Sequence, residues 1–296
     1  GWQAPNMHPE RTIMTAESQS GWFSELAPDQ GSAFSIKLES PSIHLQCGQH
    51  QIEIAQTEQW GQLLIVDGQC RLSSRDQFIY HEMLAHLALF AHPQPHRVVI
   101  IGGSDGGLSR EIRKHDSITH IWQLEPDTLL AETCRQAFDT DPTDDPRLQR
   151  ESAEALAWLH SQAPGTLDII VLDPTTVSTM VEPALLEACL HALDDEGVLV
   201  VPAGSPLFHD QSLIKPTYHQ LGLAGADNRH LVTFPLPSRS GGLWCCYLAS
   251  KQLDVTSFRI EDAAVTELGC RYYNAEMHAS ALGIPQFLRQ LLQLDE

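Results

Sequence analysis

Three acidic side chains stand at or just beyond the ends of apolar runs. Asp105 lies in the glycine-rich turn of VVIIGGSDGGLSREI (98–112), Glu125 ends IWQLE, and Asp173 ends LDIIVLD. In an open α/β sheet, ligands bind at the carboxyl ends of the parallel strands. Asp105 and Asp173 are therefore expected to face one crevice, where two carboxylates could hold an ammonium group and take its proton. The alternative for Asp173 is a helix cap or a surface acid.

The glycine-rich turn indicates a ligand that approaches the backbone closely. Gly102 and Gly103 leave room for it, and the first turn of the following helix offers free backbone N–H groups. The spacing is not the dinucleotide pattern GxGxxG, and Asp105 would repel a pyrophosphate. We therefore expect a cationic or neutral ligand at Asp105. A tight strand-to-helix turn that needs glycine for its own geometry is the alternative.

Glu125 lies about 20 residues beyond this turn, where nucleoside-binding sheets place a carboxylate that grips the ribose hydroxyls. A lone acid at a strand end is common. The combination of turn, strand and acid nevertheless favours an adenosine-type ligand.

Tyr80 and His81 precede the glycine turn on a segment with helical spacing and are placed to close the crevice. His81-Glu82 followed by His86 is similar to the zinc motif HExxH, but the spacing is HExxxH. At about 100° per residue, the two imidazoles lie roughly 140° apart on a helix, so they are badly placed to share one metal. We predict no metal site.

The composition indicates a soluble protein whose acidic surface would attract cations, although such acidity can also serve solubility alone. Lys and Arg total 18 against 38 Asp and Glu, a formal net charge of −20, so we expect neither nucleic acid nor membrane as a partner. Seven scattered cysteines without a CxxC pair indicate reduced thiols and a cytoplasmic location. The chain shows neither a signal-peptide pattern nor an apolar run of about 18 residues.

The elements that must position these residues divide the chain. We predict a flexible N-terminus over 1–20, a small β-strand domain over 21–76 and a larger catalytic domain over 77–296. The predicted N-terminal strands are Phe34–Leu38, Ile52–Ala55 and Leu63–Val66.

An amphipathic helix is predicted over Phe78–Phe90. Apolar runs then alternate with stretches of helical composition, which indicates a doubly wound, mostly parallel α/β sheet with helices on both faces. The predicted strands are Val98–Ile101, Ile121–Leu124, Leu167–Leu172 and Val198–Val201. His230–Pro237 and Leu243–Ser250 flank Ser240-Gly241-Gly242 and are expected to form an antiparallel hairpin at the sheet edge.

With these residues in place, the sequence resembles the polyamine aminopropyltransferases, the spermidine synthase family, from about Trp22 to the C-terminus. Besides the Glu125 strand end, the stretches that carry the resemblance are GQLLIVDGQCRLSSRDQFIYHEMLAHLALFAHP, VVIIGGSDGG, LDIIVLD, SGGLW and CRYYNAEMHASALGIPQFL. Together, and in this order, these stretches are specific for the family.

The resemblance implies a Rossmann-like, methyltransferase-type sheet and a transferase of polyamine biosynthesis. Such an enzyme moves an aminopropyl group from decarboxylated S-adenosylmethionine, a co-substrate, to a di- or polyamine such as putrescine, and releases 5'-methylthioadenosine. It implies a homodimer or homotetramer and no permanently bound cofactor.

By the same resemblance, Asp173 is the general base, Asp105 holds the amines of donor and acceptor, and Glu125 holds the ribose. Tyr80 and His81 bind the polyamine.

Several positions depart from the family's pattern. After Asp173 the family usually has a second acid and a loop with glycine and two prolines, whereas this chain has Thr176, Val177, Thr179 and Met180 in those slots. The family's P-T-Y near the edge hairpin appears as Pro237-Ser238-Arg239, and Arg239 would repel a dication.

Two donor contacts also differ. The family's glutamine of the N-terminal strands falls at His50, and its Gly-Asp before the Asp173 strand becomes Ala153-Glu154. Glu154 could still accept a hydrogen bond from the adenine amino group.

Two further functions stay open. One is a diverged S-adenosylmethionine-dependent transferase, for example a methyltransferase, whose acceptor is not a polyamine; Arg239 favours an acceptor that bears an anion. The other is a nucleoside-binding relative without catalysis.

Overall fold

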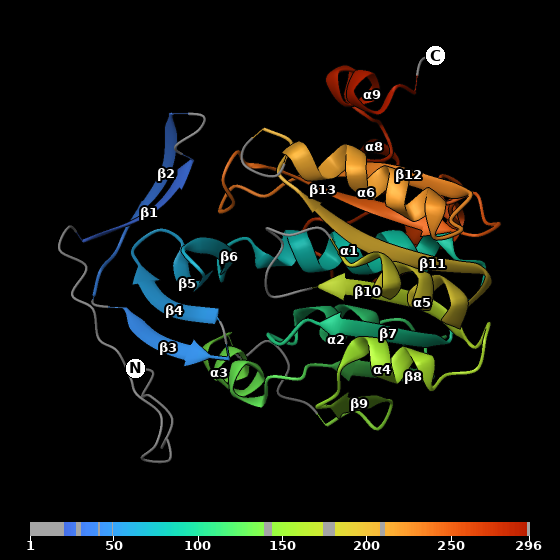
Figure 1. Ribbon diagram of the computed structural model, residues 1–296, viewed down its shortest axis with the longest axis horizontal. Coiled ribbons are helices and arrows are strands. Elements are labelled where there is room, and N and C mark those ends of the chain that lie inside the picture. The colour runs from blue at the N-terminus through green and yellow to red at the C-terminus, as the bar shows by residue number, and fades with distance from the viewer. Residues whose placement is uncertain are drawn as a thin grey trace.

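The computed structural model describes residues 21–27, 31–40, 42–48, 50–138, 144–173, 181–207 and 211–294. Within these residues the largest sheet has seven strands (Figure 1). In spatial order they are β12 (Asn228–Pro235), β13 (Leu243–Ser250), β11 (Leu193–Gly204), β10 (Leu167–Asp173), β7 (Arg97–Gly102), β8 (His120–Leu124) and β9 (Leu148–Glu151). The β11–β10–β7–β8–β9 pairs are parallel, whereas β12 and β13 form an antiparallel hairpin at the edge.

The register between β7 and β10 positions the predicted site. Val171 pairs with Ile100, and Asp173 pairs with Gly102 at the carboxyl ends of the two strands. Both strands are apolar because helices cover both of their faces, and β10 is buried at every residue except Asp173. Asp173 and the glycine-rich turn therefore lie next to each other at the carboxyl edge of the sheet.

Helices lie on both faces of this sheet. Val98 and Ile100 belong to the apolar cluster that contains α1, α2, α7 and α8, whereas Val99 belongs to the cluster that contains α4, α5, α6 and α9. The bounds are α1 (Gln77–Ala91), α2 (Gly107–Ile112), α4 (Ala155–His160), α5 (Pro183–Ala192), α6 (Gln211–Leu223), α7 (Ile260–Val265), α8 (Ala275–Ala281) and α9 (Gln286–Leu292). None of the helices in the described part of the chain is long and apolar enough to cross a membrane.

The N-terminal strands form two antiparallel sheets. Their bounds are β1 (Trp22–Ala27), β2 (Ser32–Lys37), β3 (Ile43–Cys47), β4 (His50–Thr57), β5 (Gly61–Val66) and β6 (Gln69–Ser73). Helix α3 (Thr128–Phe138) packs Leu130 and Cys134 against the sheet of β3 to β6 rather than against the main sheet. In Figure 1 the arrow of β10 points toward these N-terminal sheets, which lie over the edge where the site is expected.

The predicted doubly wound sheet, its edge hairpin and the helix after the N-terminal strands are confirmed. The prediction that this helix is amphipathic is wrong. Helix α1 is buried from Ile79 to Ala91, because the main sheet, α2 and the C-terminal segments surround it. Strands β1 and β9 were not predicted. For β9 the reason is that it has no fully buried residue and so no apolar run. The predicted flexible segment 1–20 lies outside the described residues.

Candidate active site

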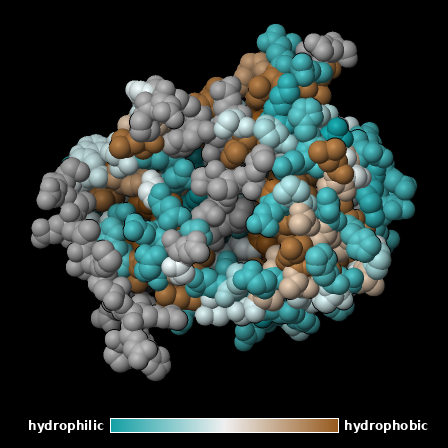
Figure 2. Space-filling view, viewed as in Figure 1, coloured by the Kyte–Doolittle hydropathy of each residue, from teal (hydrophilic) through white to brown (hydrophobic). Residues whose placement is uncertain are grey.

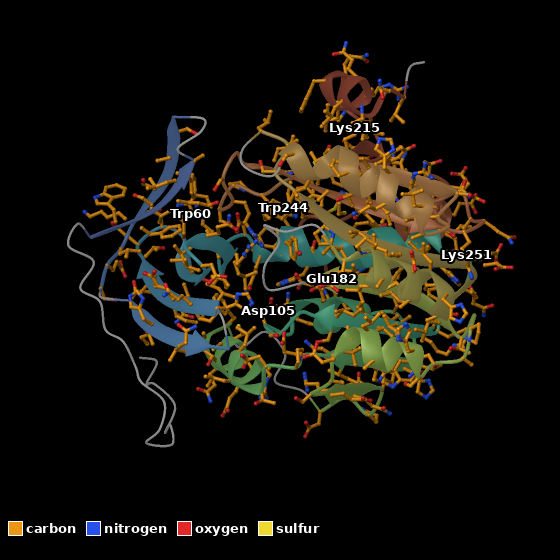
Figure 3. All side chains as sticks on the ribbon, viewed as in Figure 1. Trp60, Asp105, Glu182, Lys215, Trp244 and Lys251 are labelled. Atoms are coloured by element: carbon orange, nitrogen blue, oxygen red, sulfur yellow. The ribbon has the colours of Figure 1, made fainter. Side chains whose placement is uncertain are left out.

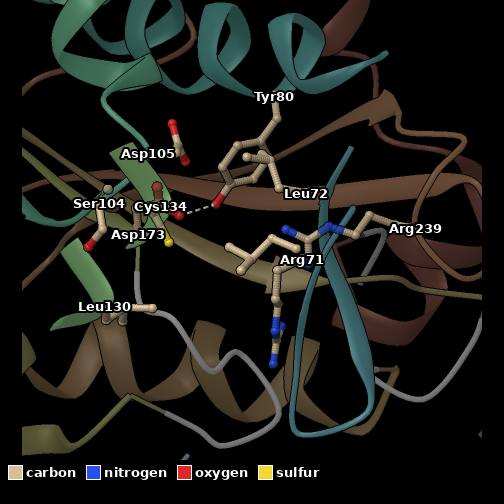
Figure 4. A pocket seen from close by; sticks show the side chains of 11 residues that line it. Arg71, Leu72, Tyr80, Ser104, Asp105, Leu130, Cys134, Asp173 and Arg239 are labelled. Atoms are coloured by element: carbon tan, nitrogen blue, oxygen red, sulfur yellow. Dashed lines mark hydrogen bonds between the residues drawn. The ribbon is translucent and has the colours of Figure 1, made fainter. Parts of the chain in front are cut away.

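Asp105, Asp173 and Tyr80 meet in one pocket at the carboxyl edge of the main sheet (Figure 4). The Tyr80 hydroxyl donates a hydrogen bond to Asp173 Oδ1 at 2.8 Å. Figure 3 places Asp105 and Trp244 in the region between the N-terminal strands and the main sheet. The pocket is lined by Leu64, Arg71, Leu72, Tyr80, Gly103, Ser104, Asp105, Leu130, Cys134, Asp173 and Arg239.

Asp173 is suited to exchange a proton near neutral pH. Burial and the nearby charge of Asp105 raise the pKa of Asp173 from 3.8 to about 6. The bond donated by Tyr80 and the charge of His81 act in the opposite direction. A carboxylate with this pKa is ionised at pH 7 and is still basic enough to accept a proton.

Asp105 is held as an anion. Its Oδ1 accepts a hydrogen bond from the Gly107 N–H at 2.6 Å and lies 3.1 Å from His81 Nε2. Burial alone would raise the pKa of Asp105, but the His81 charge and these contacts lower it. Burial alone would likewise lower the pKa of His81, whereas Asp105 raises it. The pair therefore favours a carboxylate next to an imidazolium.

Gly107 makes this contact possible. A Cβ at Gly107 would overlap the His81 ring, so only glycine allows helix α2 to approach α1 at this point. The first residues of the turn also need glycine, because Gly102 and Gly103 have φ angles of 92° and 67°. The glycine-rich motif thus has two functions: it turns the chain and makes room for a buried histidine.

Glu125 lies in an adjoining pocket of about 290 Å³, which is close to the lower end of the range for ligand sites. Ser104 Oγ donates to its Oε2 at 2.7 Å, and the Asp127 N–H donates to its Oε1 at 3.1 Å. Burial raises the pKa of Glu125. The pocket is lined by Ser104, Gly106, Gln123, Glu125, Thr128, Ala131, Arg135, Arg150, Glu151 and Ser152. Since Ser104 lines both pockets, the two form neighbouring parts of one site.

Two predicted donor contacts lie elsewhere. Glu154 is exposed at the start of α4 and lines neither pocket, although its charge contributes to the raised pKa of Glu125. His50 is half-buried on β4 and lines neither pocket, and its Nδ1 lies 2.7 Å from Asp67 Oδ2. The structure therefore brings Tyr80, His81, Asp105 and Asp173 together, but not His50.

Two arginines line the pocket on the side away from the acids (Figure 4). The sequence had marked Arg239 through the P-T-Y departure, and the structure places it in the pocket with 6% of its surface exposed. Arg71 on β6 was missed, because a single arginine in a short strand carries no signal of its own. The loop with Thr176, Val177, Thr179 and Met180 lies outside the described residues.

His81 and His86 have different partners, as the HExxxH spacing predicts. His81 contacts Asp105, whereas His86 Nε2 lies 3.2 Å from Glu111 Oε2 and 3.2 Å from Cys270 Sγ. Glu111 also pairs with Lys114 and Arg110, so its charge is already balanced by cations. This cluster joins α1, α2 and the C-terminal segment behind the pocket.

The comparisons with known proteins agree with this geometry. The sequence model of the spermine/spermidine synthase domain matches residues 77–259. A polyamine aminopropyltransferase of Halorhodospira halophila is 36% identical over 278 residues, 92% of this chain and 100% of the relative. One from Alkalilimnicola ehrlichii is 35% identical over 277 residues, 92% and 97% of the two chains.

Solved structures are similar over nearly the whole chain. Spermidine synthase from Thermotoga maritima has a TM-score of 0.85 at 28% identity, covering 97% of this chain and 98% of that one. A spermidine synthase in complex with the transition-state analogue AdoDATO has a TM-score of 0.86, also at 28% identity, covering 97% and 99%.

The main sheet is doubly wound, and its carboxyl edge carries a glycine turn, the carboxylate pair Asp105 and Asp173, and Glu125 at the position of a ribose-binding acid. These features define a Rossmann-like transferase. Within that class, the chain belongs to the spermine/spermidine synthase family.

Proposed function

We propose that this enzyme transfers the aminopropyl group of decarboxylated S-adenosylmethionine to a primary amine and releases 5'-methylthioadenosine. The observation that carries the proposal is the meeting of Asp173, Asp105 and Tyr80 in one pocket next to the pocket of Glu125. The relatives named polyamine aminopropyltransferases support the same chemistry. Putrescine is therefore the reference acceptor for an assay.

The two pockets suit the two halves of the donor. Glu125 would accept hydrogen bonds from the ribose hydroxyls, and Gly102 and Gly103 let the nucleoside approach the backbone. Asp105 and Asp173 would attract the sulfonium and the aminopropyl ammonium. Contacts of His50 and Glu154 with the donor stay predictions, since neither residue lines the two pockets.

Asp173 would act as the general base. It takes a proton from the acceptor ammonium, and the freed nitrogen lone pair attacks the carbon bonded to the sulfonium sulfur. A C–N bond forms, the C–S bond breaks, and its electron pair leaves with the sulfur as neutral methylthioadenosine. Tyr80 orients Asp173 through its 2.8 Å bond, while His81 and the Gly107 N–H orient Asp105.

We also propose an assembly of two or four copies and a cytoplasmic location. Trp22 and Leu26 on β1 are 49% and 62% exposed, and a second copy could bury these apolar side chains. The seven free cysteines fit a reducing compartment. Hydrophilic side chains are widespread on the face shown in Figure 2, as expected for a strongly acidic chain. Sedimentation velocity tests the assembly.

Calorimetric titration tests the proposed reaction, with decarboxylated S-adenosylmethionine, S-adenosylmethionine and methylthioadenosine titrated separately. An assay of methylthioadenosine release follows, with putrescine, cadaverine and spermidine as acceptors. We expect tight binding of the decarboxylated donor and release that depends on Asp173. Preference for the intact donor would instead indicate a diverged transferase, and binding without turnover a non-catalytic relative.

A further inference from the structure

Arg239 presents a buried cation to the acceptor side of the pocket. Its guanidinium carbon lies 4.5 Å from the Trp244 ring centroid and 5.7 Å from the Tyr80 ring centroid, so it is held by aromatic faces. Within the described ranges, no hydrogen bond or ion pair to its side chain is found, and its Nε is buried without a partner. A guanidinium has five N–H donors, and burying them without acceptors is costly.

Arg71 adds a second cation on the same side. It is 8% exposed and lines the same pocket, and its side chain donates to Gln69 Oε1 at 2.8 Å. Figure 4 shows Asp105 and Asp173 on one side of the pocket and Arg71 and Arg239 on the other, with Tyr80 between them.

A small polar recess adjoins this pocket, since Arg71 and Arg239 line both. That recess is lined by Glu25, Gln69, Cys70, Arg71, Arg239, Ser240 and Trp244.

Two further acids face this region. Asp76 Oδ2 accepts a hydrogen bond from the Ser238 N–H at 2.8 Å, and Glu25 Oε2 accepts one from the Cys70 N–H at 3.2 Å. Burial raises the pKa of Asp76, and the charge of Arg239 acts against this rise, so these two groups interact electrostatically. The pocket has an anionic end at Asp105 and Asp173, whereas at its other end the Nε of Arg239 is buried without a hydrogen-bond partner.

We infer that the preferred acceptor is a primary amine that also carries a carboxylate, with the amine at Asp173 and the carboxylate at Arg239 and Arg71. This inference rests on the proposed function and specifies its acceptor. An arginine fork matches the geometry of a carboxylate and can bind it through two parallel hydrogen bonds. A simple diamine would instead place its second ammonium against these cations. The carboxylate takes no part in bond making or breaking.

Matched acceptors test the inference directly. Putrescine and 5-aminopentanoate have the same number of methylene groups, as do cadaverine and 6-aminohexanoate; ornithine and lysine are carboxylated diamines. With decarboxylated S-adenosylmethionine as donor, we expect kcat/KM to be at least about tenfold higher for the carboxylated member of a pair. A preference of the wild-type protein for the plain diamines would overturn the inference.

Variants assign the preference to the arginine. In Arg239→Gln, the ratio of kcat/KM for the carboxylated amine over the diamine should fall roughly 10- to 100-fold, as expected for loss of hydrogen bonds to a charged group. Arg239→Lys should give an intermediate ratio, because it keeps the charge but loses the fork. The matched control is Arg229→Gln, which removes a half-buried arginine that stacks on Tyr218 and does not line the pocket. An equal ratio in Arg239→Gln and Arg229→Gln would contradict the inference.

A binding experiment separates this inference from the proposed reaction. Calorimetry of 6-aminohexanoate and of cadaverine, each titrated into protein saturated with methylthioadenosine, needs no turnover. Tighter binding of 6-aminohexanoate, lost in Arg239→Gln, supports the carboxylate site even if no amine releases methylthioadenosine. Equal binding of both compounds would overturn it, whereas failure of methylthioadenosine itself to bind would contradict the proposed function.

Discussion

The Tyr80 hydroxyl donates a hydrogen bond of 2.8 Å to Asp173 Oδ1, although the two residues are 93 positions apart in the chain. The bond joins helix α1 to the end of β10 and fixes one carboxylate oxygen of the proposed base. The other oxygen is thereby left for an incoming ammonium. Since an O–H donor stabilises a carboxylate, Tyr80 also tunes the protonation of Asp173.

Asp173→Asn should abolish most of the turnover. The amide cannot take a proton, and loss of a general base typically lowers the rate roughly 10²- to 10⁴-fold. Binding of methylthioadenosine should change little, because Asp173 does not line the Glu125 pocket. Methylthioadenosine release and calorimetry measure the two effects. Turnover within a few fold of wild type would exclude Asp173 as the base.

The pH profile should follow Asp173. We expect kcat/KM to fall as the pH drops below about 6, where Asp173 becomes protonated. Asp105→Asn removes the neighbouring charge that raises this pKa, so the acidic limb should move to lower pH. Tyr80→Phe removes the bond that stabilises the carboxylate, so the limb should move to higher pH. Shifts of both variants in one direction would contradict this electrostatic account.

Stability should depend on the same group. Because the folded pKa of Asp173 is raised from 3.8 to about 6, its stabilising contribution is complete below 3.8 and is lost as the pH rises through 6. Asp173→Asn does not titrate. Its free energy of unfolding relative to wild type should therefore increase by up to about 2 kcal/mol between pH 4.5 and 7.5. Urea unfolding at the two pH values measures it, and a constant difference would show that the folded pKa is not raised.

Glu125→Gln should weaken nucleoside binding. Replacing the carboxylate by an amide loses charge-assisted acceptor bonds to the ribose, which corresponds to roughly 10- to 100-fold in the Kd of methylthioadenosine. Calorimetry measures this Kd. Glu154→Gln, titrated in parallel, tests the predicted adenine contact of that exposed acid. If the Kd of methylthioadenosine is unchanged in Glu125→Gln, Glu125 does not bind the ribose of the donor.

Gly107→Ala should destabilise the fold and displace His81. The added methyl overlaps the imidazole, and overpacking of this kind typically costs about 1–3 kcal/mol. In a His81→Ala background the ring is absent, so the same methyl should cost much less. A double-mutant cycle by urea unfolding measures the coupling. Equal costs in both backgrounds would mean that Gly107 is needed for its backbone and not for His81.

Much of the candidate site could be predicted because parallel strands direct their carboxyl ends to one edge. The apolar runs before Asp105, Glu125 and Asp173 identified buried strands, and a buried parallel strand leaves only its end for chemistry. The HExxxH spacing likewise separated His81 from His86, since helix geometry alone sets the angle between them. The division at residue 76 stays a prediction, although β6 ends at Ser73 and α1 begins at Gln77.

The partners across the crevice were decided only by tertiary packing. Arg71 comes from β6, and nothing in the sequence marked it. Arg239 comes from the connection between β12 and β13; the family resemblance marked this position, but only the fold shows that it lines one pocket together with Arg71. Packing of the N-terminal sheet on α3 likewise leaves His50 on the surface, paired with Asp67. Hydrophobic periodicity reports which residues of a segment are buried, but not which other segment covers them. The sequence by itself therefore determined the strands and the acids at their ends, whereas the fold determined which cations face those acids.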